Sequence, residues 1–575
     1  MNDHIEKLSI ELKDYIRKYN HQTFVAQCCY ICNAHWRTQS NIVELHSPVR
    51  QLMYLISLYH STAFKGNERF EAYGDEYENI VRLLNAIEDC YVSTPENLIT
   101  PDYTEESLKR LFISNSTFLN YYLNASLSYF EQDVERIRQT FKHFESHIRD
   151  ETGLEIQDFI DFFFLITNLE IEIYNQHFNH KYNPEEHMLI IKMRDNPTSL
   201  TNDELLQVSY LAENGVLGLG IPINKLKESM PSEKVDKILV MFMMIRNENE
   251  NYLYYTDTCD YLSKPLLMTD PDHIALLYSK QLITAIYDYL FELCKEADKN
   301  GRKVLMRRED YLEDKTYEVF RDFFGEEAKI YSNYQVNGPE KDLLILKGKH
   351  AYIIECKANK YRIPFRDPIK AYDRINDDFK KSIGKGYQQA KEIEDLFSGD
   401  EPFEIKNERG KILETIHPSE FMEVFTIVVT QERFGQIQCD LNHLLEIDEN
   451  DNFPWAVFID DLETFLITLK RKKNHLFEFP VFLLEREKLH GRMFCSDELE
   501  LCAYFLFDRD NFLKYCNSED LFVSSPDVHQ FFDLLYHVGF GFKNELNISD
   551  KLKRYSPEAL AVINKNKLLK PESFK

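Results

Sequence analysis

The stretch of sequence that decides the fold is KDLLILKGKHAYIIECK, residues 341–357. Two apolar runs flank Gly348 and Lys349, and glycine at the first of two central positions is what a type II′ β-hairpin requires. With that turn, Asp342 is predicted to lie directly opposite Glu355. Because side-chain direction alternates along a strand, Lys357 follows on the same face as Glu355. The segment therefore predicts two carboxylates and one ammonium at the same end of a hairpin.

Two facing carboxylates need compensation, because cross-strand side chains about 5 Å apart repel by about 3 kcal/mol at an effective dielectric constant near 20. A divalent cation would provide it. Carboxylate oxygens of Asp342 and Glu355, with the carbonyl oxygen of Cys356, suit Mg²⁺ or Mn²⁺. Lys357 would then position an attacking water and offset phosphate charge. The alternative interpretation is an ion-pair cluster in which Lys357 only neutralises the two acids.

The elements around this hairpin predict an α/β domain spanning roughly residues 305–485. A short helix at 311–324 precedes the strands, and Asp367 followed by Pro368 is typical of the start of a helix. The order is helix, three strands, helix, strand, then a further strand and helix. The predicted strands are 329–336, 342–347, 351–358, 424–430 and 455–459, and the last helix is 461–469.

These residues resemble the PD-(D/E)xK nuclease superfamily over about residues 305–475. The resemblance implies a restriction-endonuclease-like fold, in which Asp342, Glu355 and Lys357 match the Asp and the Glu-x-Lys of the family motif. Lys341 stands where the family name has Pro. The resemblance implies hydrolysis of phosphodiester bonds with a 5′-phosphate and a 3′-hydroxyl as products.

The resemblance also implies two further catalytic positions outside the hairpin. Glu318, in the preceding helix, matches an additional acidic residue on the metal side, although a helical Glu is often only solvated. Lys385 and Gln389, four residues apart on one helix face, match a basic residue and a Gln of the following helix. Gln388 is the competing choice for that Gln.

The Glu-x-Lys tripeptide is not specific by itself. It also occurs at 11–13, 313–315, 327–329 and 404–406. Only the instance at 355–357 lies within a predicted strand that has an Asp placed opposite by a hairpin. The hairpin context, and not the tripeptide, therefore carries the prediction of a nuclease site.

The charge distribution supports a local nucleic-acid site. The chain has 68 Lys and Arg against 96 Asp and Glu, a net charge of −28, which opposes nonspecific binding over the whole surface. Residues 341–391 contain more basic than acidic side chains. The predicted phosphate contacts are Lys360, Arg362, Arg366, Lys381 and Lys385, with a solvated helix face as the alternative.

The predicted fold class is a multi-domain α+β protein. Residues 1–270 form a large helical N-terminal region, indicated by spacings such as Phe159, Phe162, Phe163 and Ile166, that regulates the enzyme or binds a partner protein or a second copy. Residues 271–485, with a first helix at 273–295, form the nuclease-like domain. Residues 486–575 form a small helical C-terminal appendage.

Composition places the protein in the cytoplasm, without a membrane partner. The N-terminus has no signal-peptide pattern, and no apolar stretch is long enough to span a membrane. The 11 Cys residues are irregularly spaced and odd in number, which is typical of reduced thiols. Cys29 and Cys32, with His35, have metal-like spacing, but a buried helical segment is the favoured interpretation.

The favoured function is a metal-dependent endonuclease that uses Mg²⁺ or Mn²⁺ and cuts DNA. By analogy of fold alone, it resembles prokaryotic restriction or antiphage effectors. Two alternatives stay open. One is a catalytically inactive nuclease-fold scaffold that binds nucleic acid or a partner protein, and the other is an RNA-cleaving toxin.

Overall fold

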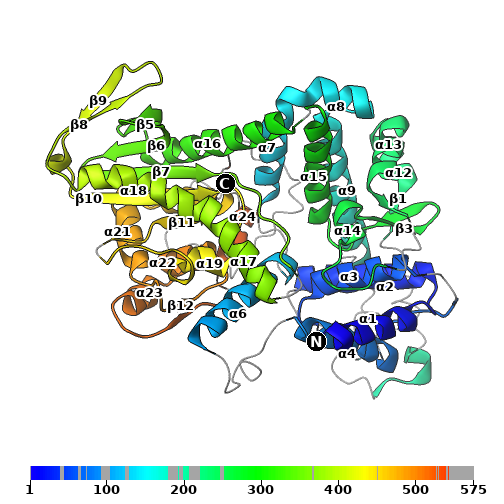
Figure 1. Cartoon of the computed structure of the whole chain (residues 1–575). Helices are drawn as coiled ribbons and strands as arrows, with labels where there is room; N and C mark the ends of the chain where they lie inside the picture. The colour runs from blue at the N-terminus through cyan, green and yellow to red at the C-terminus, as the bar shows by residue number, and fades with distance from the viewer. Residues whose placement is uncertain are drawn as a thin grey trace. The chain divides into compact units, whose positions relative to one another are not determined.

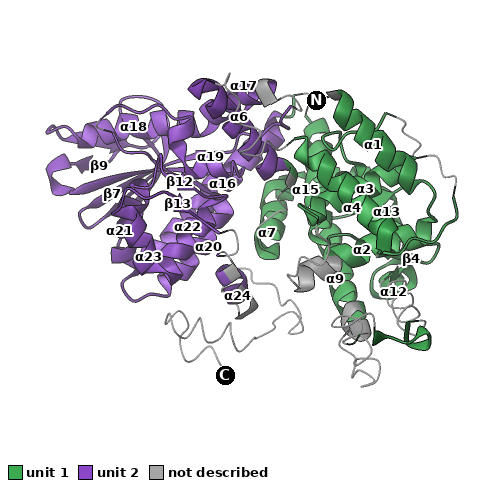
Figure 2. Cartoon of the chain, turned by 90° about the horizontal axis from the view of Figure 1, so that it is seen from below, with its two compact units in different colours: residues 1–94, 122–301 green, residues 95–121, 302–575 purple. Residues whose placement is uncertain are grey.

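A computed structural model describes most of the chain, and the chain divides into two compact units (Figure 2). The first unit comprises 1–94 and 122–301, and the second comprises 95–121 and 302–575. The described residues are 2–38, 45–62, 66–72, 74–91, 104–123, 128–178, 192, 199–205, 220–245, 251–298, 300–365, 368–449, 451–525, 528, 530–538 and 542.

The first unit is mainly helical, as predicted. Phe159, Phe162, Phe163 and Ile166 are fully buried on one helix, which confirms the interpretation of their spacing. The unit also contains a small sheet with the order β1-β4-β3-β2, which the sequence did not predict. Its elements are α1 (Asn2–Ile16), α2 (His21–Thr38), α3 (Pro48–His60), α4 (Gly74–Asp89), α7 (Phe130–Phe141), α8 (Glu145–Thr152), α9 (Ile156–Phe178), β1 (Ile221–Pro222), α12 (Ile223–Ser229), α13 (Ser232–Phe242), β2 (Met243–Met244), α14 (Asp260–Ser263), β3 (Leu266–Asp270), β4 (His273–Ala275) and α15 (Lys280–Glu296).

The second unit is built on a large mixed sheet (Figure 1). Its elements are α6 (Glu105–Phe118), α16 (Arg302–Phe324), β5 (Lys329–Gln335), β6 (Glu340–Lys347), β7 (His350–Lys357), α17 (Pro368–Phe379), the π-helix η4 (Lys380–Gly384), α18 (Lys385–Phe397), β8 (Phe403–Lys406), β9 (Ile412–Ile416), β10 (Glu423–Thr430), α19 (Gln436–Cys439), β11 (Trp455–Phe458), α20 (Ile459–Lys470), α21 (His475–Glu487), β12 (Met493–Phe494), α22 (Glu498–Phe507), α23 (Arg509–Cys516), β13 (Phe522–Val523) and α24 (Gln530–Val538).

Within the described residues, seven strands form this sheet in the order β11-β10-β7-β6-β5-β8-β9. β5, β6 and β7 pair antiparallel, whereas β10 and β11 continue the sheet parallel to β7. Leu344 pairs with Ile353. In the turn, Gly348 has a positive φ of 61°, whereas the φ of Lys349 is not positive. The type II′ turn of the β6–β7 hairpin and the predicted register from Leu343 to the turn are therefore confirmed, whereas the predicted pair of Asp342 with Glu355 is not among the pairs of the two strands.

Helices cover both faces of the sheet. On one face, Leu344 and Ile353 pack against Ala390 and Ile393 of α18. On the other face, the ring of Tyr352 lies 4.9 Å from Phe324 of α16 and 5.6 Å from Phe479 of α21. Burying each large apolar side chain stabilises the fold by about 1.5–3 kcal/mol. The apolar character of both faces of β6 and β7 therefore follows from their central place in a covered sheet.

The predicted long helix after β7 is continuous from Pro368 but contains a π-helical turn. Gly386, directly after this turn, lies so close to the sheet that a Cβ atom there would be 2.7 Å from Cγ1 of Val428 and 3.4 Å from Cγ of Lys357. Only glycine permits this approach, because any larger residue would push α18 away from the strands. Asp367, the predicted cap, lies outside the described residues.

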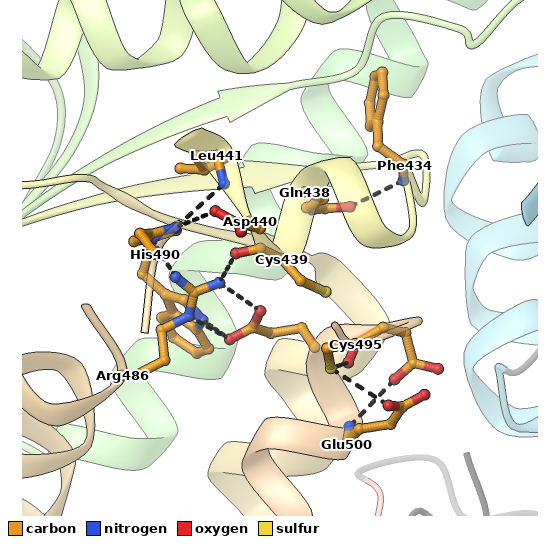
Figure 3. Close-up of polar contacts among 12 residues, drawn as sticks. Phe434, Gln438, Cys439, Asp440, Leu441, Arg486, His490, Cys495 and Glu500 are labelled. Atoms are coloured by element: carbon orange, nitrogen blue, oxygen red, sulfur yellow. Dashed lines mark hydrogen bonds and ion pairs between the residues drawn. The ribbon is translucent and has the colours of Figure 1, made fainter. Parts of the chain in front are cut away.

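The C-terminal helices belong to the second unit and do not form the separate appendage that we expected. Arg486 of α21 is buried and donates to both carboxylate oxygens of Glu498 in α22, at 2.9 and 2.8 Å. Figure 3 shows Arg486 beside Cys439 and His490. Trp455 of β11 donates to the same carboxylate at 2.7 Å, and Arg486 also donates to the carbonyl of Cys439. Breaking such a buried pair is strongly destabilising, so this network joins the C-terminal helices to the sheet.

The unit boundaries also differ from the predicted domains. The first unit extends to residue 301 instead of 270, while residues 95–121, which contain α6, join the second unit. The helix predicted at 273–295 begins only at Lys280, because 273–275 form β4, and the short helix predicted at 311–324 begins at Arg302. No helix in the described part of the chain is both long enough and apolar enough to cross a membrane.

Candidate active site at the carboxyl end of the sheet

The β6–β7 hairpin brings Asp342, Glu355 and Lys357 together. The Lys357 ammonium lies 2.9 Å from Oε2 of Glu355 and 3.5 Å from Oδ2 of Asp342. The same Asp342 oxygen accepts the backbone N–H of Cys356 at 2.6 Å. The cluster lies where β7 ends, beside the end of the parallel strand β10, because Lys357 pairs with Thr430. In open α/β sheets, ligands bind at such carboxyl ends.

The alternation of side chains is interrupted at Asp342. Lys341 and Leu344 are three residues apart, yet both contact α18. Asn333, between the pairs that β5 makes with Leu343 and Lys341, has a positive φ of 51°. The pairing of β6 with β7 ends at Leu343. Asp342 is therefore turned toward the end of β7, where it meets the Cys356 N–H, instead of simply facing Glu355 across the hairpin.

The electrostatics of the cluster are those of a buried, crowded site. The Glu355 side chain is fully buried, and its Oε1 has no hydrogen-bond partner among the described residues. Burial and the neighbouring Asp342 raise the pKa of Glu355 to about 7, against the opposing effect of Lys357. Burial lowers the pKa of Lys357, but the two carboxylates outweigh burial and raise it above its usual value. The site therefore holds a charged lysine between two carboxyl groups that resist joint ionisation.

On α16, the field of Asp342 reaches Glu313, a residue that we did not predict as part of the site. Burial, followed by the field of Asp342, raises the pKa of Glu313 to about 7. Glu318 is about 140° around the helix from Glu313. It lies on the side of Lys315, which forms a buried ion pair with Glu463 of α20 at 2.6 Å. Sequence reasoning set Glu313 aside as part of a nonspecific Glu-x-Lys, although its helical offset was the signal that could have distinguished the two acids.

Gln389 lies on the sheet side of α18, whereas the competing Gln388 is exposed. The Gln389 carbonyl accepts from Lys341 at 2.9 Å, and its side-chain Oε1 is buried without a partner among the described residues. Lys341 is 1% exposed and also donates to Glu392 at 2.6 Å. The residue that stands in place of the family Pro therefore ties the start of β6 to α18.

The predicted phosphate-binding cations differ in their surroundings. Lys360, Arg362, Lys381 and Lys385 are exposed, and Arg366 lies outside the described residues. Arg362 pairs with Asp377 and Asp378 of α17, and Lys381 pairs with Asp377 at 2.7 Å. Lys385 makes no ion pair with any described residue. A phosphate would therefore compete with carboxylates at Arg362 and Lys381, but not at Lys385.

The oxygen atoms at this site fit a hard divalent cation. Mg²⁺ is usually held by one or two carboxylates together with water and substrate phosphate. Asp342 and Glu355 supply the carboxylates, and the unpartnered Oε1 of Glu355 is a buried acceptor without a donor. The carbonyl of Cys356, the third predicted ligand, accepts a hydrogen bond from the Lys357 ammonium at 3.0 Å in this structure. Within the described residues, no three His, Cys, Asp or Glu side chains form a group that could hold a metal ion on their own.

Comparisons with known proteins add no family assignment. No protein-family model matches the chain, and neither a curated protein nor a solved structure matches it. The candidate site therefore depends on its own geometry. Elsewhere, Cys29 and Cys32 are buried in α2, where burial raises the pKa of both thiols, which supports the buried helical interpretation.

Proposed function

We propose that this protein is a metal-dependent nuclease that hydrolyses phosphodiester bonds, with DNA as the favoured substrate. The observation that carries the proposal is the meeting of Asp342, Glu355 and Lys357 at one end of the β6–β7 hairpin, within ion-pair distance of a single ammonium. A buried carboxylate with a raised pKa and an unpartnered oxygen is costly for stability, and such groups concentrate at functional sites.

The order of elements supports the finer proposal of a restriction-endonuclease-like domain. Helix α16 precedes the antiparallel strands β5, β6 and β7, and α17–α18 leads to β10, which pairs parallel to β7. This is the helix, three strands, helix, strand order that the resemblance to PD-(D/E)xK nucleases implies. We extend the proposal to a role in prokaryotic antiphage defence by analogy of fold only.

The roles of the residues follow from their placement. Asp342 and Glu355 would hold Mg²⁺ or Mn²⁺, and Glu313 replaces Glu318 as the proposed acid on the metal side. A bound divalent cation supplies Lewis-acid stabilisation of phosphate charge and lowers the pKa of water. Once Glu355 binds the cation, Lys357 would lose its ion pair with that carboxylate. Lys357 would then orient the attacking water and stabilise the negative charge that develops on the phosphate. The proposed role of the Gln389 amide is unchanged; this residue lies on the side of α18 that meets Lys341 of β6.

One observation favours a second candidate, an inactive scaffold. Lys357 already neutralises both acids at 2.9 and 3.5 Å, which is the arrangement of a purely structural ion-pair cluster. Such a cluster would be inert toward metal. The RNA-cleaving toxin shares every feature of the nuclease site, so only the choice of substrate separates it from the DNA endonuclease.

A cleavage assay tests the proposal. The purified protein is incubated with supercoiled plasmid, linear DNA and RNA in the presence of Mg²⁺, Mn²⁺ or EDTA. We expect cleavage that requires the metal, and a loss of at least about 100-fold in Asp342→Asn and Lys357→Ala, because each removes a group that acts on the developing charge.

Lys349→Ala is the matched control, since Lys349 is an exposed lysine in the turn at the other end of the same hairpin. It should cut at the wild-type rate. Cleavage that survives both site substitutions would show that the active site is elsewhere. A wild-type protein that binds nucleic acid without cutting it would favour the scaffold.

A further inference from the structure

Gln431, the first residue after β10, has a side chain that the proposed mechanism does not yet use. It is 6% exposed, and neither Nε2 nor Oε1 has a hydrogen-bond partner among the described residues. Buried amides normally satisfy both groups, and each unsatisfied group destabilises the folded state. A side chain kept in this condition requires an explanation other than stability.

The position of Gln431 connects it to the candidate site. Its backbone N–H donates to the carbonyl of Lys357 at 3.2 Å, which continues the parallel pairing of β10 with β7 beyond Thr430. Gln431 therefore stands beside Lys357 at the carboxyl end of the sheet. Because Thr430 pairs with Lys357, strand alternation places Gln431 on the other face, the face of Cys356, whose backbone N–H binds Asp342.

The loop that carries Gln431 is held in place on both sides. The Thr430 hydroxyl donates to the carbonyl of Glu432 at 2.7 Å, and the Glu432 carboxylate pairs with the buried Arg308 of α16. Arg433 pairs with Asp461 at the start of α20. The backbone that carries the unsatisfied amide is therefore held in place by its neighbours, as the support of a contact residue would be.

We propose that the Gln431 amide is a substrate contact of the candidate nuclease. Its N–H group donates to a non-bridging oxygen of the phosphodiester on the Asp342 side of the site, the face of Cys356, and its carbonyl accepts from a water molecule at the same place. An amide suits this role because it offers a donor and an acceptor together, whereas Lys or Arg offers donors only. The proposal rests on the nuclease function and adds a residue to that site.

The test compares Gln431→Leu with Gln438→Leu. Gln438 is also buried, but its amide is satisfied, since Nε2 donates to Thr430 at 2.9 Å and Oε1 accepts from Phe434 N–H at 3.0 Å (Figure 3). Leucine has a similar volume without the polar atoms. We expect Gln431→Leu to raise the melting temperature by about 2–4 °C and to lower kcat by about 10- to 100-fold. Gln438→Leu should lower the melting temperature.

The outcomes separate this proposal from the nuclease function. A Gln431→Leu protein that is destabilised like Gln438→Leu, or that cuts at the wild-type rate, overturns the contact. If the wild type does not cut, the affinity for a labelled DNA duplex, measured in Ca²⁺, takes the place of the cleavage rate as the readout. Weaker duplex binding by the more stable Gln431→Leu then still supports the contact, although cleavage has failed, and equal or absent binding overturns it.

Discussion

At the scale of single residues, the candidate site brings several costly groups together. Glu355 and Glu313 both have a pKa raised to about 7, and the amide of Gln431 is unsatisfied. An acid whose pKa is raised in the folded state holds its proton more tightly there than in the unfolded chain. These two acids therefore lower stability as pH rises from about 4.5 to about 7, and their full cost is present above pH 7.

The loss of stability with rising pH predicts how a metal ion affects the folded protein. A divalent cation relieves the cost only where the carboxyls are ionised, so Mg²⁺ should raise the melting temperature clearly at pH 8 and little at pH 5.5. Thermal melts of the wild type and of Glu355→Gln check this. The variant should be less sensitive to pH and should lose most of the Mg²⁺ effect. An equal Mg²⁺ effect in both proteins would place the ion elsewhere.

At the scale of elements, the close contact of α18 with the sheet decides where Lys357 lies. Gly386 permits that contact, because its missing Cβ leaves room for Val428 and for the Lys357 side chain. The π-helical turn before it adjusts the helix so that this glycine, and then Gln389, meet the strands. Such turns occur frequently at functional sites.

We expect Gly386→Ala to destabilise the second unit by about 1–3 kcal/mol through overpacking and to reduce cleavage by displacing Lys357. Gly384→Ala is the control, because the nearest atom to its added Cβ is 3.7 Å away, an ordinary contact. It should be neutral or slightly stabilising. Denaturant unfolding measures both. A neutral Gly386→Ala would mean that α18 can move without cost.

At the scale of the whole molecule, charge limits where nucleic acid can bind. The chain carries a net charge of −28, while residues 341–391 are locally basic. Free cations on this segment should therefore dominate the salt dependence of binding, and those already paired with carboxylates should contribute less. Lys385 is unpaired among the described residues, whereas Arg362 is paired with Asp377 and Asp378.

The slope of log Kd against log salt tests this difference. Lys385→Ala should reduce the magnitude of the slope by about 1, because one phosphate contact is lost. Arg362→Ala should reduce it by clearly less, since its charge is already offset. Fluorescence anisotropy with a labelled duplex over a salt series gives both slopes. A larger change in Arg362→Ala than in Lys385→Ala would place the phosphate path nearer to residue 362.

The sequence alone determined the β6–β7 hairpin and the three residues at its end. A two-residue turn is local, so Gly348 dictates which residues of β6 and β7 pair from Leu343 to the turn, although the alternation of side chains is interrupted at Asp342. What depends on contacts between distant segments was decided only by the tertiary structure. The packing of α16, α18 and β10 around the hairpin decides the roles of three features. These are the choice between Glu313 and Glu318, the need for glycine at position 386 and the unsatisfied amide of Gln431. The same holds for the unit boundary and for the attachment of the C-terminal helices through Arg486 and Glu498, because buried networks join residues that no local pattern relates.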